Sequence, residues 1–252
     1  MNLALSLRSE MLKTKRTASW YFVTIIAIAV SAIFVLTVSA NDPSNKANLW
    51  IAIYTEEFKS LNLLVLPMFT ILVCTLLPQI EYRNNTWKQV LASPQKFMQI
   101  YLSKFLVVQL LLLLFLFVFL VSAAVCTLLS GTLNPSLQLF DYSPDWPSLA
   151  QCTVRTYLSL LSLSVIQFVL GLTMKNFIAP IATGFVLWLV GNLLLFEMHS
   201  TLANIFPYSF SAMVVFPKYK ASFPMIELGS VGLSVLCLAG GYYLFARVKR
   251  NT

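Results

Sequence analysis

Six apolar stretches constrain this chain more than any other feature of its sequence. They cover residues 20–39, 61–80, 105–129, 156–174, 177–196 and 228–246, and none of them contains Asp, Glu, Lys, Arg or His. A helix needs roughly 20 mostly apolar residues to cross the hydrocarbon of a bilayer, because lipid offers no partner to an unpaired backbone group. Since a charge at the centre of such a helix costs roughly 2.5–3.5 kcal/mol, the pattern predicts six transmembrane helices.

The composition agrees with this prediction, because 58% of the residues are hydrophobic and only 10% are charged. A transmembrane β-barrel is excluded, since barrels are built from alternating segments of about ten residues and these runs are continuous. The first stretch is followed by Asn41-Asp42-Pro43 without a small-residue cleavage pattern, so we expect it to be retained. The predicted fold is an all-α integral membrane protein with one transmembrane domain over residues 1–252.

The distribution of basic residues predicts that both termini lie in the cytoplasm. Twelve of the 17 Lys and Arg residues fall on the side of the termini, and the other five share the opposite side with seven of the nine acidic residues. The side richer in Lys and Arg is the cytoplasmic one. A net charge of +8 could also suggest nucleic acid, but these basic residues flank the ends of the stretches, where anionic lipid headgroups explain them.

The residues before the first stretch have the spacing of an amphipathic helix. Leu3, Leu7 and Met11 recur at i, i+4 and i+8, which predicts an interfacial helix over residues 1–19 on the inner leaflet. The polar remainder includes the basic residues Arg8, Lys13, Lys15 and Arg16. The alternative is a disordered basic N-terminus, since the apolar pattern is short.

A polar segment over residues 81–104 follows the second stretch. Thr86 can cap a short helix together with Gln89, and Trp87, Val90 and Leu91 would form its apolar face before Pro94. Such a helix offers a docking surface to a soluble partner. The alternative is a loop helix that only floats on the headgroups.

The remaining connections, residues 40–60, 130–155 and 197–227, are predicted to be outer loops. The last one contains Phe206-Pro207-Tyr208 and Phe216-Pro217, so we expect it to turn back toward the membrane. The four cysteines have no metal-ligand spacing. Cys126 and Cys152 both fall near the outer side and could pair, but a small buried apolar side chain is the favoured interpretation of each.

The sequence lacks the residues that several kinds of catalytic or binding site require. His199 is the only histidine and falls in an outer loop, so neither a His-containing zinc site nor a Ser-His dyad can be built within the stretches. The sequence has no G-x-x-x-x-G-K-[ST] motif and therefore no P-loop. The absence of ionisable residues from the six stretches counts against a proton-driven carrier.

The chain resembles the ABC-2 type permeases, the six-span membrane subunits of ATP-binding cassette transporters. The resemblance rests on Ser9-Glu10 before the first stretch, on Glu81-Tyr82-Arg83 and Thr86-Trp87-Lys88 after the second, and on Ser93-Pro94 and Lys104 before the third. It covers the whole chain, including the long last outer loop, which forms a re-entrant hairpin in that family. The size and the Glu-x-x-x-x-Thr-Trp-Lys segment look most like permeases of bacteriocin or lantibiotic self-protection.

This resemblance implies a non-enzymatic permease in a bacterial plasma membrane, paired with a second identical or homologous permease chain. Cytoplasmic ATPase subunits would bind the ATP and Mg, and this chain would need no cofactor of its own. The residues implied to couple to the ATPase are Glu81, Arg83, Thr86, Trp87, Lys88, Val90 and Leu91, with Trp87 as the anchor and with Glu81 and Arg83 orienting the helix by charge.

A route between uncharged helices favours an amphipathic or hydrophobic cargo, such as a peptide or lipid, over a small ion. Two other classes remain open on the sequence: an ATP-independent carrier or channel, and a membrane scaffold or assembly factor.

Overall fold

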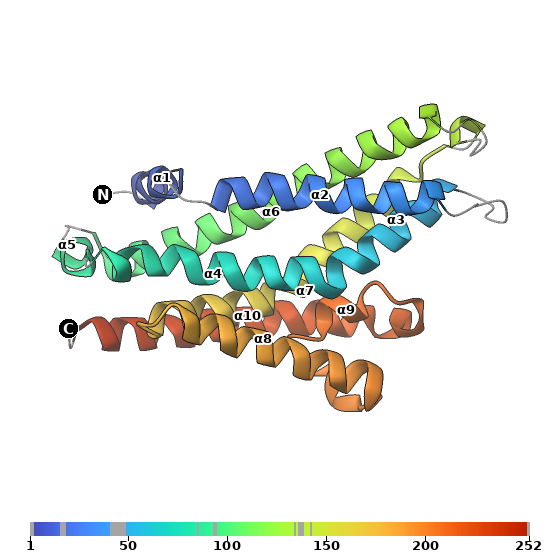
Figure 1. Ribbon diagram of the computed structural model, residues 1–252. Helices are drawn as coiled ribbons and strands as arrows, with labels where there is room; N and C mark the ends of the chain where they lie inside the picture. Colours follow the sequence, from blue (N-terminus) through green and yellow to red (C-terminus); the bar gives the residue numbers. More distant parts are fainter. Residues whose placement is uncertain are drawn as a thin grey trace.

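The structure is a computed structural model that describes residues 3–15, 19–40, 49–84, 86–92, 95–133, 135, 139–141 and 143–250. All regular secondary structure in these residues is helical, as the sequence predicts. Long helices run side by side, and both termini lie at one end of the bundle together with two short helices, α1 and α5 (Figure 1). The α-helices are α1 (Leu3–Thr14), α2 (Ser19–Ala40), α3 (Leu49–Ser60), α4 (Leu66–Arg83), α5 (Trp87–Ala92), α6 (Phe97–Leu133), α7 (Trp146–Thr173), α8 (Ile178–Asn192), α9 (Phe210–Met213) and α10 (Phe223–Arg250).

Five helices in the described part of the chain are long and apolar enough to cross a membrane by length and composition. They are Ile53–Arg83, Phe97–Leu133, Trp146–Thr173, Ile178–Glu197 and Pro217–Arg247. A shorter apolar helix, Val23–Ile33, lies within α2, where the first crossing is predicted. The chain is therefore a multi-pass membrane protein, and a sixth crossing through α2 remains a prediction.

Most of the helices are longer than the apolar stretches that predict them. Residues 49–60 form α3, although the sequence analysis placed them in an outer loop. A π-helical turn, η1 (Leu61–Val65), joins α3 to α4 without a break, so that Ile53–Arg83 is one helix. The Asn62 amide donates to the Phe58 carbonyl at 2.9 Å and to the Thr156 hydroxyl of α7 at 3.0 Å, which ties this turn to the bundle.

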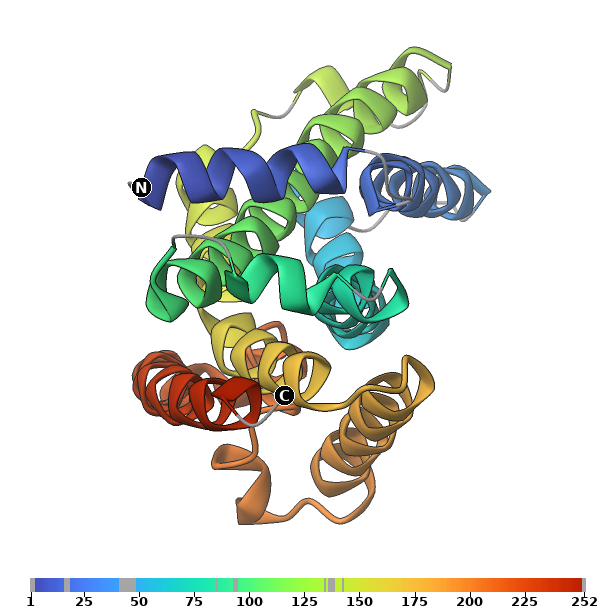
Figure 2. The ribbon, with the colours of Figure 1, turned by 90° about the vertical axis from the view of Figure 1, so that its left-hand side faces the viewer.

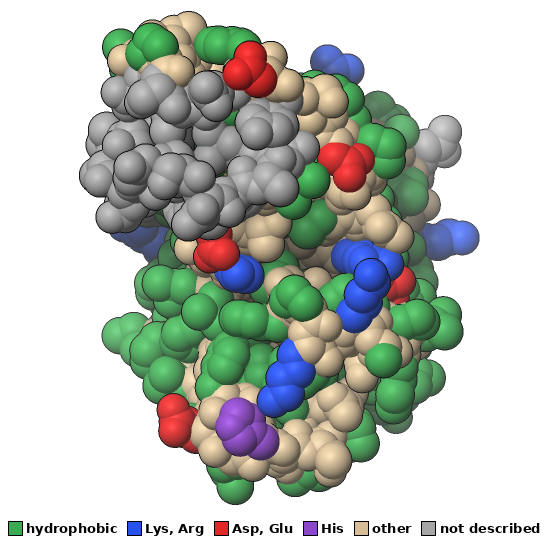
Figure 3. All heavy atoms as spheres, turned by 90° about the vertical axis from the view of Figure 1, so that its right-hand side faces the viewer, with side chains coloured by type: hydrophobic (Ala, Val, Ile, Leu, Met, Phe, Trp, Pro, Cys, Tyr) green, Lys and Arg blue, Asp and Glu red, His purple; other side chains and the backbone are tan. Residues whose placement is uncertain are grey.

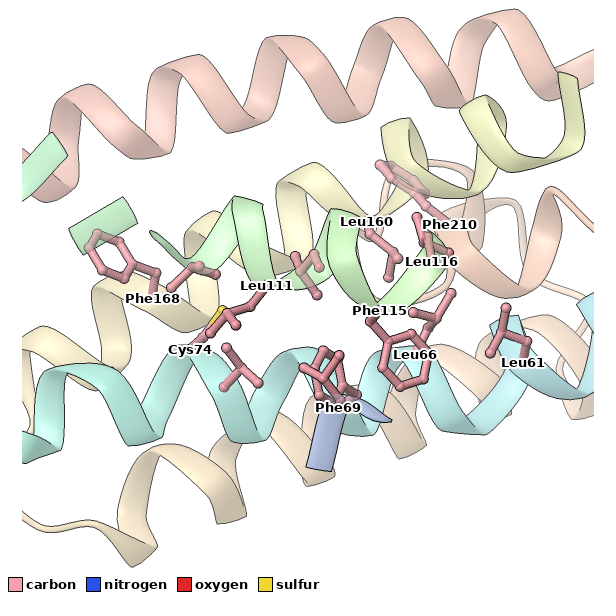
Figure 4. Close-up of a cluster of buried hydrophobic side chains, with 14 of the residues drawn as sticks. Leu61, Leu66, Phe69, Cys74, Leu111, Phe115, Leu116, Leu160, Phe168 and Phe210 are labelled. Atoms are coloured by element: carbon pink, nitrogen blue, oxygen red, sulfur yellow. The ribbon is translucent and has the colours of Figure 1, made fainter. Parts of the chain in front are cut away.

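The core lies where α4, α6 and α7 meet. Phe69, Phe115 and Leu160 are buried there and point toward one another from these three helices (Figure 4). Helix α7 approaches α4 closely because it presents Gly171, where an added Cβ would lie 2.6 Å from the Cys74 carbonyl oxygen. Small residues thus allow these backbones to pack tightly. All four cysteines, Cys126 and Cys152 included, are free thiols.

Short helices fill the connection between α8 and α10. They are η4 (Leu193–Glu197), η5 (Thr201–Asn204), α9 and η6 (Pro217–Ser222), and η3 (Leu139–Asp141) precedes α7. Tyr208 and Phe210 are buried, and the Tyr208 hydroxyl donates to the Gln167 side-chain oxygen of α7 at 3.1 Å. Part of this connection therefore packs into the bundle, and its predicted re-entrant placement in a membrane stays a prediction.

Candidate functional site

Four charged side chains from three helices meet at the end of the bundle that carries the termini. The Lys104 ammonium of α6 lies 2.5 Å from the Glu81 carboxylate of α4 and 2.7 Å from the Glu10 carboxylate of α1. Lys13 of α1 lies 2.6 Å from Glu10 and 3.2 Å from Glu81. The charges alternate around the cluster, so that each carboxylate faces both ammonium groups.

The cluster is mostly hidden from solvent. The side chains of Glu81 and Lys104 are each 2% exposed, and that of Glu10 is 13% exposed. Lys104 is this deeply placed because α6 begins at Phe97, two turns before it, whereas the sequence analysis placed Lys104 in a loop. The second Glu81 oxygen, Oε2, has no hydrogen-bond partner among the described residues.

The ion pairs of α1 outweigh the effect of burial on the pKa values of Glu10 and Lys13. Burial by itself would raise the pKa of Glu10, but the charges and hydrogen bonds of Lys104 and Lys13 hold that pKa below its ordinary value. Burial by itself would lower the pKa of Lys13, but Glu10 and Glu81 raise it. Both shifts favour the charged forms, so Glu10 and Lys13 stay ionised at neutral pH.

The short helix α5 is fixed to the bundle by an aromatic stack. Trp87 is 6% exposed, and its ring lies 5.4 Å from that of Tyr82 in α4 and 5.9 Å from that of Phe245 in α10. The Lys104 ammonium lies 5.5 Å from the centre of the Trp87 ring, within the range of a cation–π contact. The Tyr82 hydroxyl donates to the Leu172 carbonyl of α7 at 2.7 Å.

This stack corrects the role expected of Trp87. The sequence analysis placed Trp87 on a docking face, but its ring packs inside the chain and is not available as a direct anchor. The exposed side chains nearby are those of Arg83, Asn84 and Gln89, and Thr86 and Val90 are half-buried. The Thr86 carbonyl accepts a hydrogen bond from the Val90 N–H at 3.0 Å at the start of α5. The side chains of Lys88 and Leu91 lie outside the described part.

Glu81 and Arg83, which were expected to orient this helix together by charge, face different surroundings in the structure. Glu81 points into the bundle and pairs with Lys104 and Lys13, while Arg83 is exposed. Residues two apart on a helix do not share a face, so one of them can be buried while the other faces solvent. The charge that orients this end of α4 therefore comes from α1 and α6.

Helix α1 lies across the long helices at this end, as two perpendicular views show (Figures 1 and 2). Leu7 and Met11 pack against the core, as their spacing predicts, but Leu3, in the same series, is exposed. Arg8 and Lys15 are exposed as well, and Arg16 lies outside the described residues.

Two further hydrogen bonds fix α1, and neither was foreseen from the sequence. The Ser6 hydroxyl donates to the Gln95 side-chain oxygen before α6 at 3.0 Å, and the Trp20 indole N–H donates to the Thr14 hydroxyl at 3.3 Å. Helices α1, α4, α5 and α6 thus form one connected unit. We call the five residues that join them, Glu10, Lys13, Glu81, Trp87 and Lys104, the charged junction. Its groups are positioned to hold these helices together.

One family comparison agrees with this architecture. Residues 6–191 match the model of a family described as ABC-2 family transporter protein. The matched region begins in α1 and ends in α8, so it includes all five residues of the charged junction. No curated protein matches the sequence significantly.

Proposed function

The chain belongs to the ABC-2 transporter family, and we propose that it is the membrane-spanning permease of an ATP-binding cassette transporter that moves an amphipathic or hydrophobic cargo, peptide or lipid-like. Members of this family are membrane transport subunits and not themselves catalysts. ATP and Mg would be bound by separate cytoplasmic ATPase subunits, and a second identical or homologous permease would complete the assembly. The family match over the charged junction is the observation that carries this proposal.

The finer proposal concerns placement and physiology. Six crossings with both termini inside, and an outer hairpin that re-enters the membrane before α10, would place the charged junction at the cytoplasmic surface of a bacterial plasma membrane. The many basic residues at that end support this orientation. A role in bacteriocin or lantibiotic self-protection fits a cargo that is extracted from the bilayer.

The coupling route we propose runs from the surface of α5 inward. An ATPase would contact the exposed side chains around Arg83 and Gln89 at the junction of α4 and α5. The ring of Trp87 would pass the movement of α5 to α4 and α10, because it packs on Tyr82 and Phe245. Lys104 would keep α6 in register with that movement through its bond to Glu81.

Purification of the tagged chain in mild detergent tests this function. A soluble P-loop ATPase should accompany it in near-stoichiometric amount, and transport in liposomes should require both. Arg83→Glu should weaken that association, whereas Lys218→Glu, an exposed charge reversal distant in the fold, should not. Trp87→Ala should weaken it indirectly while the chain still inserts. Purification without an ATPase even after crosslinking would favour a self-sufficient carrier or a scaffold.

A further inference from the structure

Helix α3 brings an acidic residue into the interior of the bundle. Glu57 has no exposed surface, although the sequence analysis placed it in an outer loop. The reason is that α3 begins at Leu49 and continues through η1 into α4, so Glu57 lies a turn inside the apolar helix Ile53–Arg83. An ionisable side chain inside a membrane bundle is expensive, and such residues commonly have a function.

The Glu57 carboxyl has no partner. Neither of its oxygens makes a hydrogen bond within the described part of the chain, and the hydroxyl of Tyr54, one turn earlier and 7% exposed, makes none either. Their surroundings are apolar: Phe58 packs edge-on against Phe119 of α6 at 5.7 Å, and Tyr54 lies in a buried cluster with Ala123. Three polar oxygens are therefore buried together without compensation.

Among the described residues, no cation faces this carboxyl from the neighbouring helices. Helix α6 contributes the thiol of Cys126, within electrostatic range of Glu57. Helix α2 has no charged residue, and its one titratable group, Tyr21, is near its opposite end. Cys152 of α7 and Asp145, the N-cap of that helix, line a nearby hollow. Arg155 of α7 lies within electrostatic range of Cys152, but it pairs with Glu227 of α10 at 3.2 Å. On α3 itself, the remaining charges are Glu56 and Lys59, which pair with each other at 2.6 Å.

The hollow gives solvent a way toward the carboxyl. It lies between α3 and α7 and is lined by Tyr54, Thr55, Asp145, Ser148 and Cys152 together with apolar side chains. Tyr54 belongs both to this hollow and to the unpartnered group. The end of the bundle that holds it carries scattered basic and acidic side chains among hydrophobic ones (Figure 3). The hollow therefore borders the unpartnered group at Tyr54.

We propose that Glu57 is a proton-binding site that controls the packing of α3 at this end of the bundle. A buried carboxylate without a cation or hydrogen bond is strongly disfavoured, whereas the neutral acid is tolerated much better. Glu57 holds its proton while α3 is packed on α6. Loss of that proton to water forces the carboxylate to become hydrated, which loosens α3 and opens the hollow. This inference goes beyond the proposed function and requires neither a particular cargo nor a particular ATPase.

Thermal unfolding of the purified full chain between pH 5 and 9 tests the proton itself. The folded state binds this proton more tightly than the unfolded state, so stability falls as pH rises, by about 2–4 °C in Tm for each pH unit over which one proton is released. Glu57→Gln, which mimics the neutral acid, should remove this slope. Glu56→Gln, the partly exposed neighbour, should keep it. An unchanged slope in Glu57→Gln would overturn the proposal.

Thiol labelling of Cys152 tests the opening of the hollow. The chains for this experiment carry alanine at the other three cysteines. At each pH, the labelling rate of the chain with Glu57 is divided by that of the Glu57→Gln chain. The pH dependence of the thiol itself is common to both rates and drops out of this ratio. We expect this ratio to rise several-fold between pH 5.5 and 8.5, and to stay flat when Glu56→Gln is compared with the parent. A flat ratio for Glu57 would show that its proton does not control the packing.

A third measurement uses the wild-type chain, so it does not depend on whether a variant folds. Dicyclohexylcarbodiimide modifies protonated carboxyl groups in apolar surroundings, and mass spectrometry of the wild-type chain can compare Glu57 with Glu56. The modification of Glu57 should exceed that of Glu56 at pH 5 and decline toward pH 9. Equal modification of the two residues across this range would contradict a protonated Glu57.

Discussion

One continuous helix, Ile53–Arg83, carries a fully buried glutamate toward each end, and the two glutamates differ in their charged partners. Glu81 receives two lysines from two other helices, whereas Glu57 has no partner among the described residues. The two residues are 24 positions apart, about 36 Å along a helix. A paired charge fixes the helices that supply it, and an unpaired one leaves its surroundings free to respond. The helix is therefore anchored at the charged junction and adjustable at the other end.

The largest effect should come from removing the central cation of the charged junction. Lys104→Met leaves Glu81 buried with its second lysine only, and breaking a buried pair costs about 3–5 kcal/mol. The free energy of unfolding in detergent should fall by that order. Lys96→Met, an exposed lysine just before α6, should change it by less than about 0.5 kcal/mol. Equal effects would mean that Lys104 does not anchor the helices.

A double-mutant cycle measures how much of this loss belongs to the pair. Glu81→Gln and Lys104→Met should each destabilise the protein, and the double variant should lose less than their sum, with a coupling of about 1–3 kcal/mol. The same cycle between Glu57→Gln and Lys104→Met should be additive, because the two residues lie toward opposite ends of the bundle. Additivity in the first cycle would remove the contrast between the two glutamates.

The two ends should respond to pH with opposite signs. The pKa of Glu10 is lowered, because Lys104 and Lys13 outweigh its burial, so its contribution is present above the ordinary value of 4.5 and is lost as pH falls. Glu10→Gln should therefore flatten the loss of stability on acidification. Glu197→Gln, at an exposed position, should not. If Glu10→Gln kept the full acid slope, the charged junction would not be the source of that sensitivity.

Much of the fold is predictable from the apolar stretches, because five of them fall in helices that are long and apolar enough to cross a membrane. Their ends are not predictable in this way. The polar face of α3 hid the continuation of the helix, since Thr55, Glu56 and Lys59 are partly or fully exposed while Phe58 and Glu57 are buried. The sequence analysis placed Lys104 at the end of a loop because its charge interrupts an apolar pattern. In the structure Lys104 lies within α6, and its carboxylate partners come from α1 and α4.

The sequence singled out the segment after the second apolar stretch as a candidate site, but not the orientation of its side chains. The sequence named Glu10, Lys13, Glu81 and Lys104 one by one, and their meeting depends on the crossing of α1 over α4 and α6, which no local pattern contains. Trp87 has the spacing of an exposed apolar face, and the position of Phe245, far along the chain, shows that this face is already covered. Local periodicity identifies an apolar face but not what covers it.

The smallest expected effect tests whether burial, and not sequence neighbourhood, sets Glu57 apart. Lys59 and Glu56 form an i, i+3 pair at 2.6 Å with side chains 28% and 46% exposed, and such pairs contribute about 0–1 kcal/mol. Lys59→Met should therefore barely change the free energy of unfolding and should leave the pH slope assigned to Glu57 as it is. If that slope disappeared, Lys59 would be a cation that acts on Glu57. The glutamate at this end would then be paired like Glu81, and the helix would be anchored at both ends.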